Sequence, residues 1–236
     1  NYGWESIFYS QLLFGIVVLC WFWKRQPETL PPAYKKKFSM AIFVSGSKEF
    51  IKYRSAIIFT LISGLATGSF MVFLSTSQHI FEVQYGLVDE FPYIFGALAF
   101  SVGVATFTNG TLVVRFGMKK LVTIFSIVFS LTSLLYISIF YGETNPSIGI
   151  LILFLALQFF SVGFLFGNVR SLAMQPLGHI AGIGAAINGF VSTIMAVPIA
   201  TFIGGFVETT ALPLFIGFAA CGFGSLLLLL FVKKPA

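Results

Sequence analysis

The chain has 236 residues, of which 57% are hydrophobic and only 9% are charged. Soluble domains carry about 25% charged residues, so this composition excludes an ordinary cytosolic enzyme and is typical of a helical membrane protein. The net charge of +6 indicates basic loops at a membrane surface rather than binding to nucleic acid, because the chain is so apolar.

Seven apolar segments follow one another along the chain. They cover residues 7–23, 56–81, 92–114, 121–141, 148–169, 180–206 and 211–232. A helical membrane span needs about 20 apolar residues, and every segment is close to or above that length. None alternates with the period of two that a barrel strand requires, and a helix satisfies its own backbone hydrogen bonds in lipid. The sequence therefore predicts an all-α membrane protein with seven transmembrane helices.

The longest connection runs over residues 24–55 and separates the first helix, within residues 1–23, from a six-helix bundle in residues 56–236. Its first half contains three prolines and three consecutive lysines, which favour an extended chain. Its second half, residues 38–53, mixes apolar residues with lysines and predicts a short amphipathic helix on the inner membrane surface. A solvated linker with a helical stub is an equally supported alternative.

Alternating the seven helices across the membrane separates the charges. All 14 lysines and arginines fall on one side, and six of the eight acidic residues fall on the other. By the positive-inside rule, the N-terminus of this chain is outside and the C-terminus is cytoplasmic. The chain begins at Asn1, and no cationic flank precedes its first apolar segment, so we expect an N-terminally incomplete chain rather than a signal peptide.

Catalytic motifs are absent from the sequence. It contains no nucleophile elbow, zinc-protease motif or phosphate-binding loop, and its two histidines fall on opposite sides of the membrane. We therefore expect no enzyme activity, no catalytic residue, no metal and no cofactor. No carboxylate lies well within a span, so either this chain does not couple transport to protons or the coupling residue lies on a part of the protein not present here.

Uncharged polar side chains within the spans are the first candidates for a substrate cavity. Gln158, Asn188 and Ser192 must face the bundle interior or a wet cavity, because an unpaired amide or hydroxyl in lipid is costly. Hydrogen bonds between helices are an equally good explanation for them. Aromatic residues provide a second set of candidates, and Phe73 is the one assigned to the cavity wall. The other phenylalanines considered for this wall are Phe70, Phe100, Phe159 and Phe160.

Small residues at four-residue spacing predict close contact between helices. Gly182 and Gly189, in the sixth apolar segment, are expected to pack against a neighbouring helix. Pro198 lies in the same segment, where a missing backbone donor favours a bend. Bent, glycine-rich helices are where alternating-access carriers flex, so these three residues are candidates for a moving helix.

Four stretches of sequence resemble one family. GWESIF (residues 3–8) and PETLP (27–31) resemble the passage through the sixth helix into the central loop of the Bcr/CflA drug-resistance transporters of the major facilitator superfamily. NGTLVVRFGMKK (109–120) resembles that family's loop between helices eight and nine. QPLGHIAG (175–182) resembles its loop into helix eleven and is the most specific of the four.

The resemblance implies that the seven helices are the sixth to twelfth of twelve, so that residues 1–23 form the last helix of the N-terminal bundle. It further implies proton-driven efflux of small amphipathic drug-like substrates by alternating access, in a bacterial cytoplasmic (inner) membrane. The expected partners are the lipid bilayer, the substrate and the missing N-terminal helices of the same protein. No cofactor is expected beyond the proton gradient.

The same resemblance assigns a gate role to one loop. Arg115, Gly117, Lys119 and Lys120 match the cytoplasmic motif that helps to lock the inner gate of such carriers. Val114 stands where an acidic residue often precedes the arginine, and this departure weakens the gate role. Anchoring at the cytoplasmic surface explains the same basic residues without a gate.

Two other functions remain open from the sequence. A facilitator for a sugar, peptide or amino-acid-like solute would share the architecture but would need a more polar cavity. A complete seven-helix receptor would share the topology, although the long basic loop and the absence of an extracellular disulfide argue against it.

Overall fold

The computed structural model describes residues 3–28, 39–142 and 144–232. The chain divides into two parts, Asn1–Met40 and Ala41–Ala236. The first part contains α1 (Glu5–Arg25), which buries none of its residues and is apolar around its whole circumference. A helix that is hydrophobic on all sides is typical of a membrane span. This helix confirms the first predicted segment.

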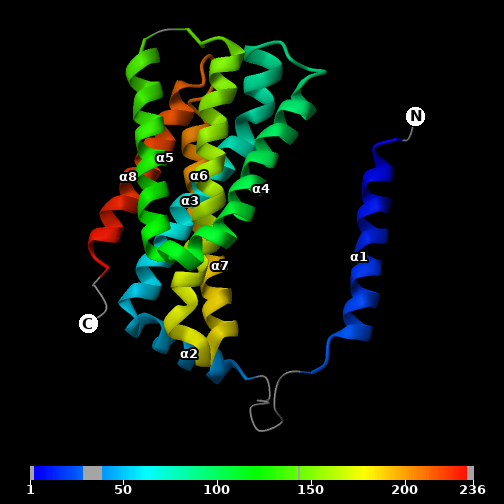
Figure 1. Cartoon of the computed structure of the whole chain (residues 1–236), viewed down its shortest axis with the longest axis vertical. Helices are drawn as coiled ribbons and strands as arrows, with labels where there is room; N and C mark the ends of the chain where they lie inside the picture. The colour runs from blue at the N-terminus through cyan, green and yellow to red at the C-terminus, as the bar shows by residue number, and fades with distance from the viewer. Residues whose placement is uncertain (1–2, 29–38, 143, 233–236) are drawn as a thin grey trace. The chain divides into compact units, whose positions relative to one another are not determined.

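The second part is a bundle of helices (Figure 1). Its elements are α2 (Met40–Lys52, which starts at the boundary), α3 (Arg54–Gln78), the π-helical turn η2 (His79–Gln84), α4 (Phe91–Phe116), α5 (Met118–Phe140), α6 (Ile148–Met174), the 3-10 turn η3 (Gln175–Ile180), α7 (Ala181–Gly204) and α8 (Leu212–Leu230). With α1, seven long helices coincide with the seven predicted segments, and no strand occurs among the described residues. The predicted all-α fold is confirmed.

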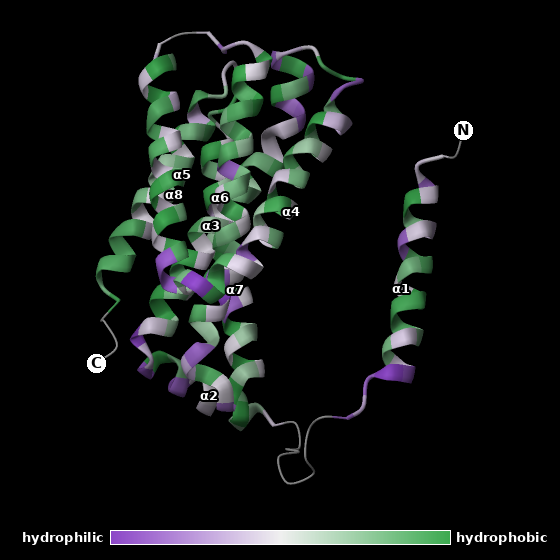
Figure 2. Ribbon diagram, in the orientation of Figure 1, coloured by the Kyte–Doolittle hydropathy of each residue, from purple (hydrophilic) through white to green (hydrophobic). Residues whose placement is uncertain are grey.

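Within the part of the chain that the structure describes, six helical stretches are long and apolar enough to cross a membrane. The number is six rather than seven because α6, η3 and α7 form one continuous stretch, Ile148–Gly204. At 57 residues, this stretch is far longer than the roughly 20 residues that one span needs, so it supplies two spans. Figure 2 shows the apolar residues that cover these helices.

Helices α3 and α6 form the centre of the bundle. α3 packs against α6, α7 and α8, while α6 packs against α3, α4 and α5. α5 and α8 also pack against each other. In contrast, α4 buries only Leu98 and Ala105, and α7 buries only four residues. Both α4 and α7 therefore present long exposed faces in this bundle.

Glycines let α3 and α7 approach closely, as the four-residue spacing predicts. A Cβ atom added at Gly64 would lie 2.5 Å from Sδ of Met195, and one at Gly68 would lie 2.8 Å from Cδ1 of Ile199. Both distances are shorter than an ordinary van der Waals contact, so a larger residue at either position would require the facing side chain of α7 to shift.

Charged residues gather at two ends of the bundle. The acidic end comprises Glu82, Asp89, Glu90 and Glu208, in η2 and the loops that precede α4 and α8. The basic end comprises Lys52, Arg54, Arg115, Lys119, Lys120 and Arg170, at the ends of α2 to α6. This separation agrees with the alternation of helices that the charge pattern predicts.

Hydrogen bonds join the three loops at the acidic end. Asn145 donates from Nδ2 to Oε1 of Gln84 at 2.9 Å, and its Oδ1 accepts from the backbone of Ala211 at 2.8 Å. His79 Nε2 lies 2.7 Å from the carbonyl oxygen of Glu208, which can only accept, so the histidine donates. These bonds hold the ends of α3, α5 and α7 together.

Helix α2 confirms that the predicted helix within residues 38–53 exists. Phe50 is buried beside Leu177 of η3, and Gly46 contacts Ile183 of α7. His179 and Glu49 are joined by a hydrogen bond of 2.5 Å from Nε2 to Oε1. Because α2 packs onto the bundle, the structural division at residue 40 falls within the predicted 24–55 loop rather than at its end.

Candidate substrate cavity

A cavity of about 190 Å³ lies between α3, α4 and α6. Its walls are formed by Phe70, Phe73, Phe95, Leu98, Ala99, Val102 and Phe159. The four residues from α4 are spaced i, i+3, i+4 and i+7, so they form one stripe along a single helix face. Two residues from α3 and one from α6 complete the wall.

Phenylalanine rings pack edge to face around this cavity. The ring centroids of Phe73 and Phe159 are 4.6 Å apart at 71°, and those of Phe70 and Phe159 are 5.6 Å apart at 84°. Phe73 also stacks on Phe95 at 6.0 Å. Such contacts fix the orientation of the rings.

Gly163 determines how closely α4 lies to α6 beside the cavity. A Cβ atom at Gly163 would lie 2.8 Å from the carbonyl oxygen of Val102 and 2.6 Å from Cβ of Ala105. Val102 also lines the cavity. The position of this cavity wall therefore depends on a glycine in the facing helix.

An amide pair holds the same two helices together nearer the basic end. Asn168 donates from Nδ2 to Oδ1 of Asn109 at 2.7 Å, and Asn109 donates back to Oδ1 of Asn168 at 3.4 Å. Asn168 is buried and also donates to the carbonyl oxygen of Phe164 at 3.0 Å. This pair satisfies two amides that would otherwise be costly in an apolar bundle.

The chemistry of the cavity is simple, because every side chain in its wall is apolar. These side chains offer neither a hydrogen-bond partner nor a charge, so they can bind apolar or aromatic groups through burial and ring contacts. Pockets for whole drug-sized molecules measure about 300–1,000 Å³. A cavity of about 190 Å³ is therefore large enough for one ring system or branch of such a molecule.

Of the four predicted cavity residues, only Phe73 lies in this wall. Gln158 faces α5 instead, where its Nε2 donates to Oγ of Ser133 at 2.6 Å and to the carbonyl oxygen of Phe129 at 3.2 Å. It precedes Phe159 by one residue, and consecutive helical residues point about 100° apart. In the described bundle, Gln158 makes the hydrogen bond between helices that the sequence offers as the alternative to a cavity role.

Asn188 and Ser192 also bond to a neighbouring helix. Asn188 donates from Nδ2 to Oγ1 of Thr60 at 2.9 Å, and Ser192 donates to Oγ of Ser63 at 3.1 Å. Both are buried at the contact between α7 and α3. One turn of helix separates the two bonds, so together they fix the register of α7 along α3.

The other phenylalanines considered for the wall divide into two groups. Phe70 and Phe159 line the cavity. Phe100 is 73% exposed, and Phe160 packs against Phe125 and Phe164 on another side of α6.

Gly182 and Gly189 are not packing residues in the described bundle. A Cβ atom at either position would meet nothing within 4 Å, because both lie on the exposed face of α7. Gly184, between them, is the glycine that contacts Met174 and Leu177. Pro198 also lies on the exposed face, and α7 runs as one helix from Ala181 to Gly204 around it.

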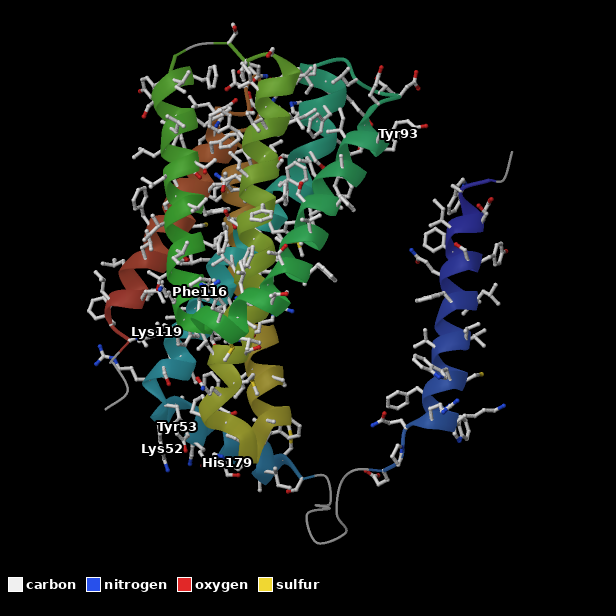
Figure 3. All side chains as sticks on the ribbon, in the orientation of Figure 1. Lys52, Tyr53, Tyr93, Phe116, Lys119 and His179 are labelled. Atoms are coloured by element: carbon white, nitrogen blue, oxygen red, sulfur yellow. The ribbon has the colours of Figure 1, made fainter. Side chains whose placement is uncertain are left out.

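The loop between α4 and α5 is a single residue, Gly117, with φ of +78°. This conformation favours glycine, which explains its place between two helices. Arg115 and Lys120 lie over the ring of Phe116, at 5.3 and 5.2 Å from its centroid. Lys119 instead donates from Nζ to the carbonyl oxygen of Val232 at 3.4 Å (Figure 3). Two of the three cations are thus held within the loop, and the third reaches the end of α8.

Comparison with known proteins places this bundle in a family. A model of the Major Facilitator Superfamily matches residues 1–200 of the chain. The chain belongs to the Major Facilitator Superfamily. An uncharacterized MFS-type transporter, YdgK of Bacillus subtilis (strain 168), is 24% identical over 217 residues, which are 89% of this chain and 52% of the relative. The chain thus spans about half the length of this relative, and no solved structure matches it.

Membership of the Major Facilitator Superfamily identifies an integral membrane protein of a secondary transporter family. It also points to transport rather than enzymatic catalysis, in agreement with the sequence. The alternative of a seven-helix receptor is replaced by this assignment.

Proposed function

We propose that the protein is a secondary active transporter that exports small amphipathic drug-like molecules, and that the cavity between α3, α4 and α6 receives their apolar part. The observation that carries this proposal is the chemistry of the cavity wall. Seven apolar side chains, four of them phenylalanines, line it, and no polar side chain does. Such a wall binds many shapes of apolar group and selects weakly among them.

The polar residues of the bundle argue against the facilitator alternative. A sugar or amino acid needs hydrogen-bond partners that remain available to it. Gln158, Asn188 and Ser192 donate to neighbouring helices, and none of them lines the described cavity. The described cavity therefore suits an apolar cargo better than a polar solute.

Proton coupling and membership of the Bcr/CflA group belong to the same proposal. They are supported by the sequence resemblance at residues 3–8, 27–31, 109–120 and 175–182. Within the described spans, acidic residues occur only near helix ends, at Glu5 and Glu82. We place the coupling carboxylate on further helices of the protein.

The upstream helices of the protein would pack against the exposed faces of α4 and α7. The exposed faces of α4 and α7 are apolar, and Gly182 and Gly189 on α7 would permit close contact there. We assign these faces to the upstream helices expected from the sequence. The basic end faces the cytoplasm in this proposal, and the membrane is a bacterial inner membrane.

Transport by the full-length protein in proteoliposomes tests this function. An imposed pH gradient should drive movement of the aromatic cation ethidium, and a protonophore should abolish that movement. Movement of a sugar or an amino acid without ethidium would instead establish the facilitator. Ethidium movement at the same rate with and without the pH gradient would contradict proton coupling.

A further inference from the structure

A second cavity, of about 450 Å³, lies at the basic end of the bundle, away from the aromatic cavity. It is formed where α3 and α5 begin and where α6 and α8 end. Its polar lining comes from Ser55, Lys119 and Gln175. Its apolar lining includes Phe59, Met118 and Leu172. The proposed transport function uses none of these side chains.

The polar groups of this cavity retain free hydrogen-bonding capacity. Lys119 makes one long bond of 3.4 Å to the carbonyl oxygen of Val232, and an ammonium group has three donors. Among the described residues, nothing pairs with the hydroxyl of Ser55 or the side-chain amide of Gln175. A ligand with several acceptor oxygens would satisfy all three side chains together.

The electrostatic surroundings select an anion. Among the acidic residues described in the bundle, only Glu49 lies at the basic end, and it pairs with His179. Arg54 lies next to Ser55, with its guanidinium 6.0 Å from the centroid of the Phe231 ring. In addition, α3 and α5 begin at this cavity without a side-chain cap, so the positive ends of their dipoles add to the lysine charge.

We propose that this cavity binds the phosphate group of an anionic phospholipid from the membrane leaflet at the basic end. Lys119 and Ser55 would donate to the phosphate oxygens, as charge-assisted bonds to phosphate are strong. Phe59, Met118 and Leu172 would contact the apolar part of the lipid below its headgroup. A free phosphate ion shares the headgroup chemistry, but it has no apolar part to contact these three side chains. Basic pockets between transmembrane helices are known to hold anionic headgroups.

Titration of the full-length protein with lipids tests the proposal. Binding of phosphatidylglycerol and of phosphatidylcholine with identical acyl chains is measured by native mass spectrometry in detergent. Phosphatidylglycerol should bind more tightly. Lys119→Gln should weaken it about fivefold, the effect of one lysine near a membrane surface, while Lys119→Arg should retain binding. Lys120→Gln is the matched control, because Lys120 has the same charge but lies over Phe116 rather than in the cavity.

Three results would overturn the proposal. Equal losses in Lys119→Gln and Lys120→Gln would mean that general surface charge attracts the lipid. Equal affinity for the two lipids would remove the anionic headgroup as the ligand. Displacement of phosphatidylglycerol by millimolar inorganic phosphate would assign the cavity to a free anion. Retained binding in Lys119→Arg separates the loss of charge from a failure to fold.

Discussion

The contact at Gly163 allows a sharp test of how α4 lies against α6. Gly163→Ala places a methyl group 2.8 Å from a backbone oxygen and 2.6 Å from another Cβ atom. Neither neighbour can move aside by rotating a side chain, so α4 itself must shift. Overpacking of this kind costs about 1–3 kcal/mol.

Gly167→Ala is the matched control, one turn further along the same helix. A Cβ atom there meets nothing within 4 Å. Both substitutions gain the same helix propensity, about 1 kcal/mol relative to glycine. This gain cancels in the comparison, so the two variants should differ by about 1–3 kcal/mol in the free energy of unfolding, or about 2–12 °C in Tm.

Cys221 provides the signal for this measurement. It is buried in α8, 5% exposed, whereas the three tryptophans lie in or next to α1 and do not report on the bundle. In a background where every other cysteine is replaced, a thiol-reactive dye becomes fluorescent only when the bundle opens. Should Gly163→Ala melt at the temperature of Gly167→Ala or above it, the described approach of α4 to α6 is wrong.

Three further predictions test other parts of the structure. Asn168→Leu should destabilise the bundle by about 1–3 kcal/mol, because it leaves the amide of Asn109 unpaired; the same dye assay should show that adding Asn109→Leu restores part of the loss. In intact cells, an impermeant thiol reagent should label a cysteine at Asp89 and not one at Lys52; the reverse result would invert the topology. Burial raises the pKa of Tyr85 to about 12 from 10.0, so the folded state holds this proton more tightly and Tm should fall as the pH rises from 10 towards 12. Tyr85→Phe should make that fall shallower, and an unchanged slope would show that Tyr85 does not cause it.

The helices were predictable because span length and composition leave few alternatives in a chain this apolar. Each predicted segment depends on about 20 consecutive residues, so single ambiguous positions do not change it. The charges at the two ends follow from the same count of spans. Neither feature requires knowledge of which helices are neighbours.

The wall of the substrate cavity was only partly predictable. Phe73 was identified, but the α4 stripe that includes Phe95 and Ala99 was not. An apolar stripe with this spacing also fits a face that contacts lipid or another helix. The rotation of α4 about its axis decides among these environments, and that rotation depends on the contact at Gly163.

Polar and small residues were ambiguous for the same reason. Gln158 and Asn188 can satisfy an amide in a cavity or on a neighbouring helix, and the structure shows the second arrangement. Gly163 and Gly167 share one spacing pattern, yet only Gly163 contacts another helix. Asn168 carries the same signal, because a buried asparagine in a span needs a partner.

Filling the aromatic cavity tests the central claim most directly. Ala99→Phe places a ring in the cavity wall, whereas Ala97→Phe places the same ring on the same helix but outside that wall; both positions are exposed in the described bundle. The measurement is the dissociation constant of the aromatic cation tetraphenylphosphonium for the full-length protein in lipid nanodiscs. Our account predicts binding at least about tenfold weaker in Ala99→Phe, a loss of about 1.4 kcal/mol, and unchanged binding in Ala97→Phe. Equal affinity in Ala99→Phe and the unsubstituted protein would contradict a substrate site between α3, α4 and α6.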